Sequence, residues 1–123
     1  MGRVVFVEDD ATIRKLVRVA LRSTAHEVHF AANGREGLEL VARVRPDVVF
    51  TDVAMPDMDG LQLADAMRAR PDLAAIPIVI ITASLQREQI QRYFAHGART
   101  YLAKPFSTAQ LREQVEKLVG TPR

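Results

Sequence analysis

The chain has 123 residues, which is enough for one compact domain and too few for two ordinary ones. It contains no cysteine, which excludes disulfides and thiolate metal sites, and its 48% apolar and 26% charged residues are typical of a folded globular domain. No apolar run approaches the roughly 20 residues of a membrane span and no signal peptide is evident, so we expect a cytoplasmic protein with no membrane contact.

Short apolar runs recur along the chain, at residues 4–7, 28–31, 48–50, 76–81 and 101–103. β-branched and aromatic residues dominate them, and the central runs are apolar on both faces, as in parallel strands that are covered on both sides. Helical periodicity fills the stretches between and after them, clearest in one apolar face and weaker in the pair Ile90 and Phe94. That clear face is formed by Ile13, Leu16, Val17, Ala20 and Leu21.

Glycine and proline separate these segments where an alternation of strands and helices requires turns. The pattern predicts an α/β domain in which five βα units, (βα)5, form a doubly wound five-stranded parallel sheet. We expect this domain to occupy residues 1–120, with residues 121–123 as a C-terminal tail or the start of a linker.

Polar residues follow four of the predicted strands. Glu8 and Asp9 come after the first run, Asp52 after the third, Thr82 after the fourth and Lys104 after the fifth. The carboxyl ends of parallel strands meet at one edge of a sheet, where such folds bind their ligands. The sequence therefore predicts one pocket that combines these side chains, provided that the first and third strands are neighbours.

Such a pocket needs a cation. Two carboxylates about 4 Å apart repel by about 1 kcal/mol in water and by about 4 kcal/mol at an effective dielectric constant of 20. Oxygen ligands alone favour Mg²⁺ or Mn²⁺. A divalent metal, the Lys104 ammonium and the Thr82 hydroxyl around the Asp52 carboxylate would form a phosphoryl-transfer site, with the carboxylate as the attacking group.

Each of these residues also has a plain structural explanation when it is taken alone. One acid of the Glu8-Asp9-Asp10 run could cap the following helix, Lys104 could be a solvated surface lysine, and Thr82 could simply end a strand. The functional interpretation depends on all of them falling at the same edge of the sheet.

Longer motifs carry a resemblance over almost the whole chain. Residues 6–14 (FVEDDATIR), 52–60 (DVAMPDMDG), 81–83 (ITA) and 97–106 (GARTYLAKPF) match, in order and spacing, the motifs of one family. The chain resembles the receiver domain of bacterial two-component response regulators, in the CheY-like superfamily. The resemblance implies a flavodoxin-like sheet with strand order 2-1-3-4-5, and it makes Glu8 and Asp9 the acidic pair and Asp10 an extra loop acid.

The resemblance also implies roles for the site residues. Asp52 would accept phosphate from a phosphohistidine, and Mg²⁺ would be held by Asp9, Asp52 and the backbone oxygen of Ala54, with Glu8 acting through water. Lys104 and Thr82 would contact the phosphoryl group.

Switching follows from the same resemblance. Thr82 would move towards the phosphate and Tyr101 would turn inward behind it, remodelling the face that combines strand 101–103 with the helices around Ile90 and Phe94 and after residue 106. Pro56, Gly60 and Pro105 would support the loops, and the bond before Pro105 is expected to be cis.

The implied partners are a sensor histidine kinase or histidine phosphotransfer protein and an output partner or domain whose identity the sequence leaves open. A dimer that forms through the same face on phosphorylation is one expected mode of output.

Other function classes fit the sequence less well. An aspartyl phosphatase of related fold carries a second aspartate two residues after the nucleophile, where this chain has Ala54. A binding module that has lost phosphorylation would lack one of the acids or Lys104. DNA binding through Arg14, Lys15, Arg18 and Arg22 lacks a recognition motif. We therefore expect a phosphoacceptor switch rather than an enzyme, with no direct nucleic-acid binding by this domain.

Overall fold

The computed structural model describes residues 2–119, so the predicted tail at 121–123 lies outside the described residues. The strands are β1 (Arg3–Val7), β2 (Glu27–Ala31), β3 (Val48–Asp52), β4 (Ile78–Thr82) and β5 (Thr100–Ala103). The helices are α1 (Ala11–Leu21), α2 (Gly34–Val44), α3 (Gly60–Arg68), α4 (Arg87–Ala95) and α5 (Thr108–Val119).

All neighbouring strands are parallel, and the sheet order is β2-β1-β3-β4-β5. Strand and helix alternate along the chain as predicted, and β1 and β3 are neighbours, which the predicted pocket required. The predicted fold class and strand order are therefore confirmed.

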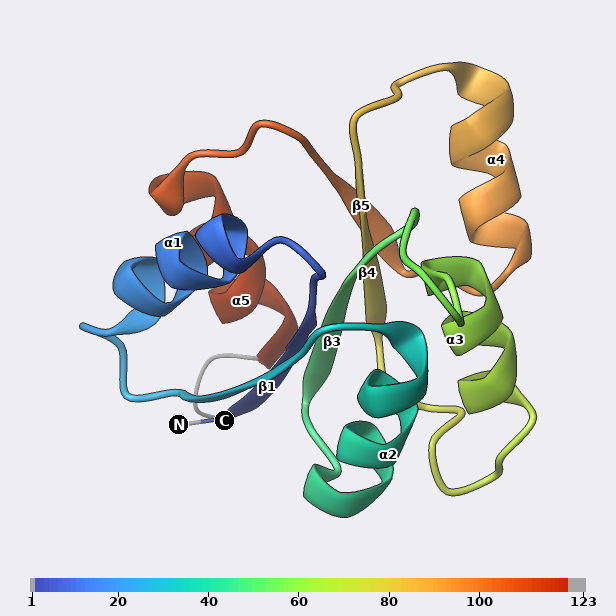
Figure 1. Cartoon of the computed structure of the whole chain (residues 1–123), viewed down its shortest axis with the longest axis horizontal. Coiled ribbons are helices and arrows are strands. Elements are labelled where there is room, and N and C mark those ends of the chain that lie inside the picture. Colours follow the sequence, from blue (N-terminus) through green and yellow to red (C-terminus); the bar gives the residue numbers. More distant parts are fainter. Residues whose placement is uncertain (1, 120–123) are drawn as a thin grey trace.

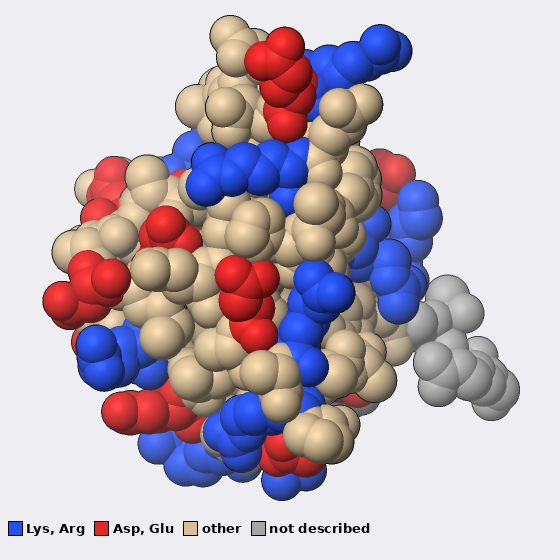
Figure 2. Space-filling model, turned by 90° about the vertical axis from the view of Figure 1, so that its right-hand side faces the viewer, with Lys and Arg blue, Asp and Glu red and all other residues tan. Residues whose placement is uncertain are grey.

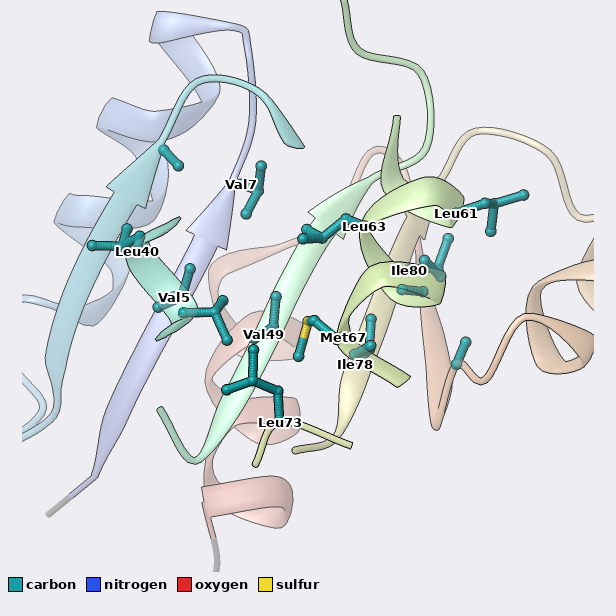
Figure 3. Close-up of a cluster of buried hydrophobic side chains, with 14 of the residues drawn as sticks. Val5, Val7, Leu40, Val49, Leu61, Leu63, Met67, Leu73, Ile78 and Ile80 are labelled. Carbon is teal, nitrogen blue, oxygen red and sulfur yellow. The ribbon is translucent and has the colours of Figure 1, made fainter. Parts of the chain in front are cut away.

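Helices cover both faces of the sheet, with α1 and α5 on one side and α2, α3 and α4 on the other (Figure 1). Alternate residues of β1 enter the two resulting cores, Val4 and Phe6 facing α1 and α5, and Val5 and Val7 facing α2 and α3. Figure 3 shows the second core, in which side chains of β1, β3 and β4 pack against those of α2 and α3. Burial on both faces explains why the central strands are apolar throughout.

The structure corrects three details of the sequence prediction. The fourth strand begins at Ile78 rather than Ile76, since Pro77 has no N–H to donate to the ladder and Ile76 closes a turn onto Leu73. Leu16, predicted to face the core, is 42% exposed, and it borders a hollow beside Phe106.

The third correction concerns helix α4. Phe94 was predicted to face the core but is 47% exposed, and its neighbour Tyr93 is buried instead. Two adjacent aromatic residues on a short polar helix leave the inward face undecided by periodicity alone. The contacts of the Tyr93 hydroxyl, described below, account for the choice.

No helix within residues 2–119 is long and apolar enough to cross a bilayer. On the side of the molecule that carries α3 and α4, basic and acidic side chains lie interspersed, without a large patch of one sign (Figure 2).

Candidate functional site

Three carboxylates converge at the carboxyl edge of the sheet. Glu8 and Asp9 follow β1 and Asp52 ends β3, and these strands pair up to Val7 and Thr51. One ligand oxygen from each carboxylate lies within 4.8 Å of the others. Among the described residues this is the one cluster of acidic or histidine side chains with the spacing of a metal site. The structure thus brings together the acids that the sequence singled out.

Glu8 is the most confined of the three, with no exposed surface. One carboxylate oxygen, Oε2, accepts a hydrogen bond from the backbone N–H of Asp10 at 3.3 Å, whereas Oε1 makes no hydrogen bond among the described residues but forms an ion pair with Nζ of Lys104 at 3.2 Å. Burial, reinforced by the negative charge of Asp52, raises the pKa of Glu8 to about 7. A buried carboxylate in this state can take up a proton or bind a cation.

Within the described residues, Lys104 is the cationic side chain that forms ion pairs with these carboxylates. Its Nζ donates a hydrogen bond to Oδ2 of Asp52 at 2.8 Å and lies 3.2 Å from Oε1 of Glu8. Burial opposes the charge of the ammonium, but the hydrogen bond and charge of Asp52 outweigh it, so the pKa of Lys104 is raised above its ordinary value. The lysine is therefore charged and clamped between two carboxylates.

The backbone fixes this lysine in place. The N–H of Lys104 donates to the carbonyl of Thr82 at 2.8 Å, which carries the β4–β5 pairing one residue past the strands. The Lys104–Pro105 bond is cis, as the resemblance implied.

A divalent cation fits this donor set. Three carboxylates face one ammonium, which leaves negative charge uncompensated, and the buried Oε1 of Glu8 has an ion-pair contact with Lys104 but no hydrogen bond among the described residues. All the donors are oxygens, which Mg²⁺ and Mn²⁺ prefer.

Asp10 is the residue of the Glu8-Asp9-Asp10 run that caps the following helix, a role that the sequence analysis expected one of these acids to have. It is the N-cap of α1, and its side chain accepts from the N–H of Thr12 at 2.8 Å. Capping and ligand roles are thus divided between neighbouring residues.

The loop after β3 is held close to Asp52 by the start of α3. Asp59 forms a capping box with Gln62, and Gly60 donates its N–H to the carbonyl of Val53 at 2.9 Å. A Cβ at Gly60 would collide with the carbonyl oxygen of Asp52, so only glycine allows this approach. Ala54 and Pro56 lie exposed in the same loop.

Thr82 lies at the end of β4 beside the pocket and is buried. Its hydroxyl is 2.8 Å from that of Tyr93 on α4, a residue that sequence reasoning missed. Tyr101, the predicted switch aromatic, is half-buried on β5 opposite Ile80. Only the burial of Tyr93 distinguishes it, and no spacing rule in the sequence signals that burial.

Comparison with known proteins agrees with this geometry. The family model described as "Response regulator receiver domain" matches residues 4–116. The chain belongs to this family. Receiver domains are the switch components of two-component signalling systems, and this chain is one of them.

Relatives and solved structures are similar over nearly the whole chain. The transcriptional regulatory protein PdtaR of Mycobacterium tuberculosis is 38% identical over 96% of this chain and 57% of its own length. The chemotaxis response regulator CheY4 of Vibrio cholerae superposes with a TM-score of 0.90 at 34% identity, covering 96% of this chain and 98% of that one.

A third similar structure is the receiver domain of the sensor histidine kinase PA1611 from Pseudomonas aeruginosa, which has a magnesium ion coordinated in its active-site cleft. Its TM-score is 0.88 at 27% identity, with 98% of both chains covered. The present chain spans between 12% and 57% of the length of the curated relatives it matches.

Proposed function

We propose that this receiver domain is a phosphoacceptor switch in which Asp52 takes a phosphoryl group from a phosphohistidine of a sensor histidine kinase or histidine phosphotransfer protein. The observation that carries the proposal is the position of Asp52, which is partly exposed and hydrogen-bonded to Lys104 at 2.8 Å. A carboxylate oxygen of Asp52 would attack phosphorus as the bond to the imidazole nitrogen breaks. The imidazole leaves, and an aspartyl phosphate remains.

Lys104 would serve this step from where it already lies. Its ammonium reaches both Asp52 and Glu8, so it can remain between them while meeting the negative oxygens of the incoming group. Thr82 would contribute its hydroxyl to the same oxygens, and Pro56, Gly60 and Pro105 would keep the loops around them in place.

The proposed cofactor is Mg²⁺ or Mn²⁺, held by Asp9, Asp52 and the backbone oxygen of Ala54, with Glu8 acting through water. The buried Glu8 oxygen that makes no hydrogen bond among the described residues and the excess of carboxylates over ammonium support this assignment, as does the magnesium ion reported for the similar domain of PA1611. When bound, the cation supplies positive charge against the phosphoryl oxygens.

The output would leave through the face formed by α4, β5 and α5, with Tyr101 as a switch residue, towards an output partner or domain or a second phosphorylated copy. The chain would act in the cytoplasm, as a switch rather than an enzyme with turnover, and without direct nucleic-acid contact. Residues 1–120 would form the receiver domain.

Intact-mass spectrometry after incubation with acetyl phosphate tests the proposal. Wild-type protein with Mg²⁺ should gain one phosphoryl group, which base or hydroxylamine removes, whereas Asp52→Asn or added EDTA should prevent the gain. A phosphoryl group that forms equally well in Asp52→Asn, or without divalent metal, would overturn the proposal.

A further inference from the structure

Tyr93 joins helix α4 to the residue that is expected to sense phosphate. Its side chain is only 4% exposed, within the core between the sheet and α2, α3 and α4. Its hydroxyl lies 2.8 Å from Oγ1 of Thr82, itself only 4% exposed. Both hydroxyls are thus buried, and each depends on protein partners rather than on water.

The other contacts of Thr82 decide which hydroxyl donates. Oγ1 of Thr82 accepts from the N–H of Ser84 at 3.1 Å and is 3.2 Å from the carbonyl oxygen of Ser84. If Thr82 gives its single proton to that carbonyl, Tyr93 donates to the remaining lone pair of Oγ1. With this assignment both hydroxyls and the N–H and carbonyl of Ser84 are hydrogen-bonded. The Thr82 hydroxyl then bonds to Ser84 and to Tyr93 on α4 rather than to Asp52.

We propose that Tyr93 is a positioning residue that latches the Thr82 hydroxyl on the α4 side, so that a phosphoryl group on Asp52 must break the Thr82–Tyr93 hydrogen bond. The inference rests on the proposed function of Asp52 and assigns part of the switching energy to this one bond. When Thr82 turns towards the phosphate, the buried Tyr93 hydroxyl loses its partner, which is costly in a buried site.

The latch also gives the switch a route into α4. The carboxyl end of this helix is tied to α3, because His96 pairs with Asp65 at 2.8 Å and Arg68 donates to the carbonyl of Ala95 at 3.2 Å. At the amino end of α4, Ile90 packs against the core, and the N-cap Gln86 makes no side-chain capping bond within the described residues. Tyr93 lies in the carboxyl half of α4, two residues before Ala95, so its release would act on the part of the helix that contacts α3.

The conservative variant Tyr93→Phe removes the hydroxyl and keeps the ring in the core. Because the bond exists only in the unphosphorylated state, its removal should raise the affinity for beryllofluoride with Mg²⁺ by roughly three- to tenfold. The same variant should lower the melting temperature of the unliganded protein, and lower it less once beryllofluoride is bound. Opposite effects on stability and affinity distinguish a latch from a residue that only packs.

A double-mutant cycle isolates the bond. In a Thr82→Ala background the change Tyr93→Phe should leave beryllofluoride affinity unaltered, because the partner hydroxyl is already absent. In a Thr82→Ser background, which keeps the hydroxyl, the gain should return. An effect of Tyr93→Phe that is equally large in Thr82→Ala would overturn the latch.

Wild-type protein offers a second readout should Tyr93→Phe fail to fold. A slowly exchanging hydroxyl proton shared by Thr82 and Tyr93 should be visible by NMR without ligand and disappear on beryllofluoride binding, and its persistence would contradict the inference. If wild type binds beryllofluoride and Tyr93→Phe binds it no more tightly, only the latch is wrong. If wild type does not bind it at all, the proposed function of Asp52 is wrong as well.

Discussion

The two edges of the sheet hold their charged groups in opposite ways. At the amino edge a hollow of about 490 Å³ is lined by charged and polar groups that have hydrogen-bond or ion-pair partners. His26 accepts the N–H of Gly2 and contacts Glu116 at 2.7 Å, and Asp47 accepts the N–H of Arg3 at 2.8 Å.

The carboxyl edge instead buries Glu8 with one oxygen that makes no hydrogen bond among the described residues, and it places three carboxylates around one ammonium. The difference teaches that uncompensated charge, rather than a hollow in the surface, distinguishes the edge that we propose to be functional. The arrangement of these charged groups is therefore expected to lower the free energy of unfolding of the domain.

The largest expected effect concerns Lys104. Lys104→Met should slow phosphorylation of Asp52 by acetyl phosphate by about 100-fold or more, since removal of one group that stabilises developing charge costs about that much. Initial rates measured by mass spectrometry check this. Lys117→Met, which removes an exposed lysine from α5, is the matched control, and equal rates in the two variants would refute the role of Lys104.

Substitutions of the neighbouring acids Asp9 and Asp10 should have different effects, one on metal binding and the other on the stability of helix α1. Asp9→Ala should weaken Mg²⁺ binding by about 100-fold or more, because even residues behind metal ligands contribute ten- to hundredfold. Asp10→Ala should leave Mg²⁺ affinity nearly unchanged and lower the free energy of unfolding by about 1 kcal/mol, through loss of the α1 cap. Calorimetric titration and denaturant unfolding of both variants measure the two effects, and undiminished Mg²⁺ binding by Asp9→Ala would remove it from the site.

Glu8 should make the protein less stable as pH rises. Its folded-state pKa of about 7 exceeds the unfolded value of 4.5, so the folded state holds the proton more tightly between these values and unfolding becomes easier as pH increases. Without divalent metal, Glu8→Gln should raise the free energy of unfolding by about 1–3 kcal/mol at pH 8 and by little at pH 4. Urea unfolding of both proteins in EDTA across this range gives the difference, and a Gln variant that is less stable at pH 8 would contradict the account.

A substitution at the amino edge of the sheet should change the stability of the domain but not its phosphorylation or Mg²⁺ binding. His26→Phe should lower the free energy of unfolding by about 1 kcal/mol through loss of the Gly2 and Glu116 contacts. Phosphorylation of Asp52 and Mg²⁺ affinity should stay at wild-type levels in the variant that remains folded. A slowed phosphorylation rate would mean that the two edges are coupled.

The alternation of strands and helices was predictable from the hydrophobic pattern, whereas the strand order came from the family resemblance, and with it the meeting of Glu8, Asp9, Asp52 and Lys104. The carboxyl ends of parallel strands all lie at one edge of the sheet, where the charged residues fall, but which strands are neighbours there was implied by the resemblance alone. The sequence also predicted that one acid of the Glu8-Asp9-Asp10 run could cap the following helix, but only the structure shows that this acid is Asp10.

The inward face of α4 was not predictable. Its helical pattern has two adjacent aromatic residues, and tertiary contact with Thr82 rather than periodicity turns Tyr93 inward and leaves Phe94 exposed. A hydrogen bond between two buried hydroxyls on separate elements leaves no local signature in a sequence. The latch therefore depends on information that only the packed chain contains.

The central claim is that one carboxylate of the acidic edge, that of Asp52, carries the phosphoryl group. Borohydride reduces an aspartyl phosphate to homoserine, so peptide mapping after acetyl phosphate treatment and reduction identifies the acceptor directly. Homoserine should appear at position 52, and only when Mg²⁺ is present during labelling. Homoserine at position 9 or 57, with an unchanged aspartate at 52, would contradict the account.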